Sequence, residues 1–222
     1  MIEITDVLPL VPARGGSVAI PHKNTRRLSD GTSLLFRAVE VAKAVFGWAV
    51  VSTDDTDTAE LAARMKVSVV FRQVTGDGPM LAVVREAVEL FPDARAVALL
   101  QPTAPLRSAE SIASAVELFT NEATAVVSVS PIPAKFSRPW RLRIVNGRLL
   151  TEEGDWSTIP PRRQDIQPCE FVRDGSLYLT RAATVRAGSL YGDRVVPWIT
   201  PENERLNIDS WEDWAALEAR LR

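Results

Sequence analysis

Residues 7–24 read VLPLVPARGGSVAIPHKN, a short apolar run that turns abruptly polar. The run has the length of a buried strand and is followed by a proline. Two glycines and two cations, Arg14 and Lys23, come next. Glycine lets backbone N–H groups approach a ligand closely and cations supply countercharge, so this segment suits a phosphate. The spacing matches neither common glycine-rich phosphate motif, and a plain strand-to-helix turn is the alternative.

The same order of strand and helix repeats through the first 130 residues. Apolar runs alternate with stretches whose apolar positions recur with helical period. Near-continuous apolar strands are typical of a parallel sheet that helices cover on both faces. We therefore expect an open, doubly wound α/β sheet whose ligands bind at the carboxyl ends of its strands. Strands are expected at 7–11, 48–53, 67–72, 96–101 and 124–130, and helices at 33–46, 57–65, 79–91 and 108–119.

The pattern changes after residue 130. Asn146 and Gly147 stand between two strand-like runs within 140–150, which is a strong sequence signature of a hairpin. Residues 156–168 are expected to form an ordered loop, 171–180 and 194–199 strands, and 209–221 an amphipathic helix.

The composition excludes several classes of function. The 222 residues are 46% hydrophobic and 24% charged, as in an ordinary globular protein. The net charge of −2 provides no field that would attract nucleic acid. A single cysteine, Cys169, excludes an intrachain disulfide and a thiolate metal cluster. The single histidine, His22, excludes a multi-histidine metal site and has no nucleophile elbow to partner it.

The sequence gives no sign of a membrane segment. The N-terminus lacks a basic stretch followed by a long apolar one, and no apolar run approaches ~20 residues. We therefore expect a cytoplasmic protein that binds neither membrane nor nucleic acid.

Three further polar segments stand at expected element ends, and each has a structural alternative. The aspartates of VSTDDTDTAE, at 51–60, would hold a metal or simply favour the start of the next helix. LLQPTAPLR, at 99–107, is either a polar rim that includes Gln101 and Arg107 or a loop stiffened by prolines. Asp209 is suited to Mg²⁺, and its spacing to Glu212 is also that of an N-cap and its partner.

Together and in this order, these segments resemble the acylneuraminate cytidylyltransferase family, the CMP-sialic acid and CMP-Kdo synthetases. The resemblance rests on VPARGGSVAIPHKN, VSTDD, VVFR, LLQPTAPLR, VVSVS, PPRRQDIQP, DGSLYLT and LNIDS. It implies a Rossmann-like α/β nucleotidyltransferase domain over 1–222, a homodimer, and a hairpin element at 133–168 for dimerisation and the acceptor side. It also implies transfer of CMP from CTP to the hydroxyl of a sugar acid, such as a sialic or other nonulosonic acid, with Mg²⁺ as cofactor and release of pyrophosphate.

The resemblance assigns roles to individual residues. Arg14, Lys23 and Asp209 would be catalytic, because charges at these positions would stabilise the transferring phosphate. An arginine on the acceptor side suits a sugar carboxylate, because its fork binds both oxygens. Nucleotide binding is expected at Ala13, Arg14, Gly15, Gly16, Ser17, Lys23, Asn24, Arg72 and Asp77, acceptor binding at Gln101, Arg141, Arg163 and Tyr178, and metal binding at Asp209 and Asn207.

Several positions depart from the family's usual pattern. Val18 and Ala19 replace a lysine and a glycine, Asn207 replaces an aspartate, and Asp174 replaces an asparagine. A carboxylate at 174 would repel an acidic acceptor if it pointed inward. Three functions stay open: a cytidylyltransferase for a sugar acid or another acid such as a phosphonate, a nucleotidyltransferase with another base such as GTP, and a catalytically weak nucleotide-binding protein.

Overall fold

The computed structural model describes residues 2–75, 78–152, 154–160, 162 and 170–222. The chain divides into two compact units, one formed by Met1–Ser128 with Asp174–Arg222 and the other by Val129–Arg173. The expected insertion at 133–168 lies within the second unit. Among the described residues, no helix is long and apolar enough to cross a membrane.

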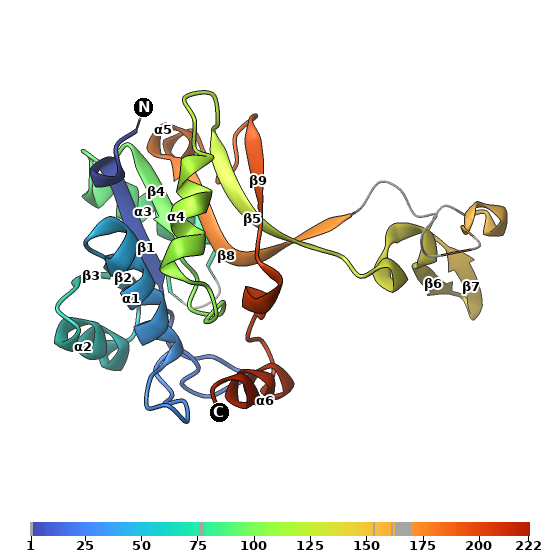
Figure 1. The fold of residues 1–222 in the computed structure, drawn as a ribbon, viewed down its shortest axis with the longest axis horizontal. Coiled ribbons are helices and arrows are strands. Elements are labelled where there is room, and N and C mark those ends of the chain that lie inside the picture. Colours follow the sequence, from blue (N-terminus) through green and yellow to red (C-terminus); the bar gives the residue numbers. More distant parts are fainter. Residues whose placement is uncertain (1, 76–77, 153, 161, 163–169) are drawn as a thin grey trace. The chain divides into compact units, whose positions relative to one another are not determined.

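A seven-stranded sheet forms the centre of the first unit (Figure 1). Its strands are β1 (Val7–Pro12), β2 (Val50–Thr53), β3 (Ser68–Phe71), β4 (Ala96–Leu99), β5 (Ala125–Pro131), β8 (Phe171–Arg181) and β9 (Val195–Ile199). They lie in the order β3-β2-β1-β4-β8-β5-β9. β1 pairs in parallel with β2 and β4, β2 pairs in parallel with β3, and β8 runs antiparallel to β4. The expected mostly parallel α/β sheet is confirmed.

Helices cover both faces of this sheet. The α-helices of the first unit are α1 (Leu34–Phe46), α2 (Thr56–Arg64), α3 (Met80–Leu90), α4 (Ala109–Glu117), α5 (Ala182–Arg186) and α6 (Trp211–Arg220), the last of which packs apart from the sheet. α1 packs with α4 on one face, and α3 packs with α5 on the other (Figure 1). The helices expected from periodicity all form close to their expected bounds, and Ser108 is the N-cap of α4.

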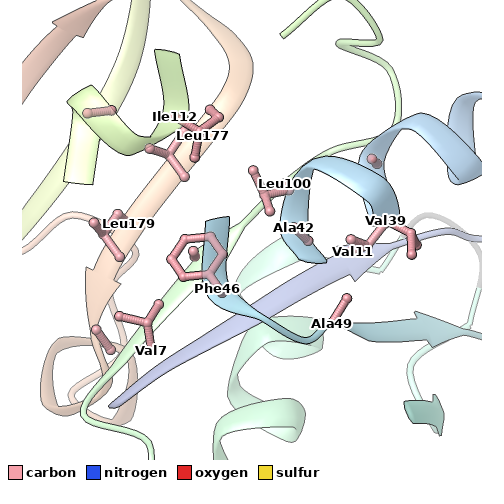
Figure 2. Close-up of a cluster of buried hydrophobic side chains, with 14 of the residues drawn as sticks. Val7, Val11, Val39, Ala42, Phe46, Ala49, Leu100, Ile112, Leu177 and Leu179 are labelled. Atoms are coloured by element: carbon pink, nitrogen blue, oxygen red, sulfur yellow. The ribbon is translucent and has the colours of Figure 1, made fainter. Parts of the chain in front are cut away.

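β1 is buried on both faces because its side chains alternate between two apolar clusters. Val7 and Val11 point to the α1 face, where Phe46 also packs (Figure 2). Leu8 and Leu10 belong to the cluster on the α3 face. This two-sided burial makes β1 a central strand and places the residues that follow it at the carboxyl edge of the sheet.

A third apolar cluster joins the segment between β1 and α1 to the C-terminal helix. Ile20, Leu28 and Leu34 pack there with Trp214 and Leu217 of α6. Ile208, just before α6, is fully buried in the same cluster. The cluster therefore packs the segment that follows β1 against α6.

The N-cap of α6 lies one residue later in the chain than expected. Asp209 with Glu212 was the predicted pair, but Ser210 is the N-cap and Asp213 completes the capping box. Asp213 Oδ2 accepts hydrogen bonds from the backbone N–H groups of Asp209 and Ser210, at 3.0 and 2.8 Å. The capping role of Asp209 was therefore wrong, because the neighbouring serine and Asp213 satisfy the same pattern with shorter side chains.

We expect Asp213→Ala to lower the free energy of unfolding by about 1 kcal/mol at neutral pH. Burial raises the pKa of Asp213, but hydrogen bonds from Asp209 and Ser210 outweigh it and bring the pKa below its ordinary value. A carboxyl whose pKa is lowered by folding stabilises the native state above its unfolded pKa and loses this contribution as pH falls through the folded one. The free energies of unfolding of wild type and variant, measured with urea, should therefore differ at neutral pH and converge in acid. Asp193→Ala, at an exposed loop position, is the control, and a pH-independent difference would contradict the capping role.

The second unit contains the expected hairpin. β6 (Leu142–Val145) pairs antiparallel with β7 (Arg148–Thr151). Asn146 and Gly147 turn the chain between them with φ values of 51° and 74°, as a tight hairpin turn requires. Many large apolar side chains of this unit are exposed, a pattern that marks interaction surfaces. They include Phe136, Leu142, Ile144, Val145, Leu149, Leu150 and Trp156.

Candidate active site

The carboxyl ends of β1, β3 and β4 open into a pocket of about 320 Å³. Ligands of open α/β sheets bind at this edge. Pro12, Pro102, Thr103, Met80 and Val83 form part of its wall. The predicted site residues that line it are Arg14, Lys23, Asn24, Arg72, Gln101, Asn207 and Asp209.

The glycine loop encloses a smaller cavity of about 50 Å³, lined by Gly15, Gly16 and Ser17. Arg14, Lys23 and Asn24 line both cavities, so the two adjoin. A Cβ at Gly15 would lie 2.7 Å from that of Asp55, and Gly16 has a φ of +64°. Both positions therefore need glycine, and the result is a small cavity flanked by two cations, which suits a phosphate.

Asp54 ties the glycine loop to the far wall of the pocket. Its Oδ1 accepts hydrogen bonds from Gly15 N at 2.9 Å and from Arg72 Nη2 at 3.3 Å. The side chains of Asp54 and Arg72 are only 9% and 3% exposed, so water screens this ion pair little. The N–H of Gly15 is therefore used inside the protein, and Arg72 is held in place in the pocket wall.

The aspartate cluster thus has two separate structural roles. Asp55 caps α2 by accepting a hydrogen bond from Thr58 N at 2.9 Å, which confirms the helix-start alternative for this residue. Asp54 forms an ion pair with Arg72. Within the described parts of the chain, no group of three or more histidine, cysteine or acidic residues is arranged to hold a metal.

Lys23 joins the glycine loop to the segment before α6. Its Nζ donates to the carbonyl oxygen of Ile208 at 2.8 Å and lies 3.4 Å from Asp209 Oδ1. Asn207 Nδ2 donates to the other carboxylate oxygen of Asp209 at 2.5 Å. The Asp209 side chain is thereby oriented on both sides while 69% of it stays exposed.

Gln101, the predicted acceptor-binding residue that follows β4, lines another part of the pocket. Its side chain lies so close to Gly175 that a Cβ at Gly175 would collide with Gln101 Oε1. Asp174 does not line the described pocket. Its Oδ1 accepts from Ser176 N at 3.1 Å and its Oδ2 from Thr200 Oγ1 at 2.6 Å. The half-buried carboxylate is therefore held by two donors of its own unit and does not point into the described pocket.

The remaining predicted site residues lie elsewhere. Ala13 is fully buried beneath the loop. Tyr178 packs against the apolar cluster on the α3 face and is not among the residues that line the described pocket, so its acceptor role stays a prediction. Arg141 belongs to the second unit. Asp77 and Arg163 lie outside the described residues.

Sequence reasoning missed three kinds of contribution to the site. Met80 and Val83 line the pocket from the first turn of α3, although their periodicity marked only a helix. Asp54 was not expected to pair with Arg72. Arg107, expected on a polar rim or in a stiff loop, is buried. No local signal reveals these roles, because each depends on a partner from a distant segment.

Comparison with known proteins identifies the family of this chain. Residues 8–182 match the family model described as cytidylyltransferase. The chain is 31% identical to the CMP-N,N'-diacetyllegionaminic acid synthase of Legionella pneumophila, over 96% of this chain and 94% of that protein. It is 28% identical to N-acylneuraminate cytidylyltransferase A of Danio rerio, over 96% of this chain and 50% of the relative, so it spans about half of that protein.

A solved structure shares the fold. CMP:2-keto-3-deoxy-manno-octonic acid synthetase complexed with CTP superimposes with a TM-score of 0.71 at 15% identity, over 97% of this chain and 98% of that one. At this identity the match concerns the fold alone. The family model, by contrast, runs from the first strand through β8. A match of that extent, with a relative of nearly equal length, shows that the chain is an enzyme of the cytidylyltransferase family.

Proposed function

We propose that this protein transfers CMP from CTP to a hydroxyl of a nonulosonic acid, a sugar acid of the sialic type, and releases pyrophosphate. The observation that carries the proposal is the pocket at which Arg14, Lys23 and Asp209 meet, beside a glycine loop. The names of the Legionella and Danio relatives support both the cytidine donor and the acidic sugar acceptor.

In this reaction the acceptor oxygen forms a bond to the α-phosphorus of CTP, and the bond from that phosphorus to the bridging oxygen of pyrophosphate breaks. Negative charge grows on the departing pyrophosphate. Arg14 and Lys23 border the two adjoining cavities and would bind the triphosphate there. Fixed cations of this kind stabilise the transition state because they need no reorganisation when the charge develops.

The donor set fits a magnesium ion that substrate phosphates help to hold. Mg²⁺ commonly takes one or two protein carboxylates and completes its shell with phosphate oxygens and water. Asp209 supplies an exposed carboxylate at the pocket wall, and Asn207 orients it through its amide nitrogen. Asp209 and the carbonyl oxygen of Asn207 would hold the ion. When bound, the ion would offset phosphate charge.

Arg72 is the residue best placed to read the base. Arg72 lines the pocket, and its Nη2 is engaged by Asp54. Its Nε is buried without a hydrogen-bond partner in the part of the chain that the structure describes. Cytosine offers acceptor atoms on its pairing edge, and a buried donor gains most when such an acceptor satisfies it.

Pyrophosphate release tests the function. The protein would be incubated with Mg²⁺, each of the four nucleoside triphosphates, and a panel of sugar acids and small phosphonates. We expect release only with CTP and a nonulosonic acid, together with a product of the mass of the CMP-sugar. Release with GTP, or with a phosphonate as acceptor, would overturn the proposal and indicate a different nucleotide or a different acceptor. CTP binding by calorimetry without release on any acceptor would indicate a weakly catalytic nucleotide-binding protein.

We expect Asp54→Asn to weaken CTP binding at least tenfold, which corresponds to about 1.4 kcal/mol. The change removes the charge that holds the buried Arg72 and weakens the tie to Gly15, while the side chain keeps its shape. Isothermal titration calorimetry with CTP measures the effect. Asp57→Asn, in the exposed first turn of α2, is the matched control. Equal affinities for both variants would show that the ion pair does not shape the nucleotide site.

We further propose that the protein is a homodimer formed through the exposed apolar surface of the hairpin. Ile144, which is 77% exposed, is the test position. We expect Ile144→Asp to give a monomer in light scattering after size exclusion, because a charge would be buried at the interface. Leu90→Asp, at an exposed apolar position on α3, should leave the dimer intact. A monomeric wild type, or a dimeric Ile144→Asp variant, would refute this interface.

A further inference from the structure

Arg107 is a buried cation beneath the acceptor side of the pocket, with only 4% of the residue exposed. Its guanidinium reaches two strand ends at once. Nη2 donates to the carbonyl oxygen of Gln101 at 2.5 Å, and Nη1 donates to that of Ser176 at 2.8 Å. One side chain therefore joins the segment after β4 to β8.

This bridge stands where the pairing between the two strands ends. The antiparallel register of β4 and β8 runs as far as Leu99 opposite Tyr178. Gln101 and Ser176 each lie two residues beyond that pair. Arg107 donates to one carbonyl on each side beyond that pair, so its rigid fork bridges the two strand ends there.

Two carboxylates supply the countercharge for this cation. Burial lowers the pKa of Arg107 to about 9, while the charges of Asp174 and Glu204 raise it, so the side chain stays charged at neutral pH. Glu204 is itself buried and accepts a hydrogen bond from Ser111 Oγ. Asp174 is held by Ser176 N and Thr200 Oγ1. A buried ion is tolerated when charges and hydrogen bonds compensate it in this way.

The bridge acts on the part of the pocket that faces the acceptor. Gln101 lines the pocket, and its side chain lies against Gly175, which has a φ of +78°. A shift of either strand end would move the Gln101 side chain or make it collide with the neighbouring backbone. Arg107, in contrast, is not among the described residues that line the pocket.

We propose that Arg107 is a positioning residue for the acceptor: through its two carbonyl contacts it holds the Gln101 side chain in position against Gly175. The inference rests on the proposed function for the identity of the acceptor. Asp174 supports the same strand end, because its Oδ1 accepts a hydrogen bond from the N–H of Ser176, the residue whose carbonyl Arg107 binds.

The kinetic test uses Arg107→Lys, which keeps the charge and removes the fork that binds two carbonyls. We expect KM for the sugar acid to rise at least tenfold, while the dissociation constant of CTP changes less than twofold. Arg181→Lys is the matched control, since Arg181 also donates to backbone carbonyls, those of Ala123, Thr120 and Asn121, from the far end of β8. Unchanged acceptor KM, or a parallel loss of CTP affinity, would overturn the proposal.

Hydrogen–deuterium exchange provides a readout that needs no acceptor. In Arg107→Lys we expect the amides of residues 100–104 and 175–178 to exchange at least tenfold faster, and those of the loop at 13–24 to exchange as in wild type. Asp174→Asn should change the same segments in the same direction and serves if the lysine variant does not fold. Unchanged exchange in the folded variant, or faster exchange throughout the first unit, would overturn the positioning role. A wild type that releases no pyrophosphate with any sugar acid would instead refute the proposed function.

Discussion

Arg14→Ala is expected to lower kcat/KM about 1,000-fold and to leave the fold intact. Arg14 lines both the main pocket and the loop cavity, and a guanidinium can bind two phosphate oxygens at once. Its carbonyl oxygen, not its side chain, receives the hydrogen bond from Asn24 Nδ2 at 3.1 Å. Truncation of the side chain therefore removes a cation from the site without removing this internal tie of the loop.

Steady-state pyrophosphate release measures this effect, and thermal denaturation checks the fold. Arg14→Lys keeps the charge without the fork and should fall between wild type and the alanine variant. Arg85→Ala, on the exposed face of α3, is the control for loss of an arginine. A near-normal rate for a folded Arg14→Ala variant would contradict the proposal that the glycine loop binds the triphosphate.

The second large effect is expected for Asp209→Asn, about 100-fold in kcat at fixed magnesium. Asp209 is the one carboxylate among the described residues that line the main pocket. An amide keeps the shape and a neutral oxygen but loses the charge that attracts a divalent cation. The dependence of rate on magnesium concentration should therefore shift to higher concentration in the variant.

The shift in magnesium dependence distinguishes a metal role from a simple structural one. Lys23 and Asn207 both contact Asp209, so a structural change would alter CTP affinity even without metal. We expect CTP binding measured in the absence of magnesium to change little. Asp193→Asn, at an exposed position, controls for loss of a carboxylate. The metal assignment fails if the magnesium titrations of variant and wild type coincide.

Much of the fold could be predicted from local pattern, because strands buried on both faces, such as β1, are nearly continuous apolar runs. The hairpin could be predicted from Asn146 and Gly147, whose backbone angles few other residues adopt. The antiparallel direction of β8 could not, since pairing between distant segments is set by tertiary packing. The short helix α5 (Ala182–Arg186) was missed because five residues carry little periodicity.

The site was predictable only in part. Arg14, Lys23 and Asp209 were brought together by a family resemblance, since nothing local links residues so far apart. The interior position of Arg107 could not be read from its neighbours, because the groups that make it tolerable, Asp174 and Glu204, come from elsewhere in the chain. Buried ion pairs are set by partners distant in sequence, whereas apolar periodicity is local.

The hydrogen bond from Lys23 to the carbonyl oxygen of Ile208 has a consequence for the folding of the site. Lys23 and Ile208 are 185 residues apart in the sequence, so their contact forms only when distant parts of the chain have come together. Until Ile208, Asp209 and α6 dock onto the apolar cluster with Ile20, the loop lacks one wall. A chain whose central strands are paired but whose α6 is undocked would thus be largely folded while its candidate site stays incomplete.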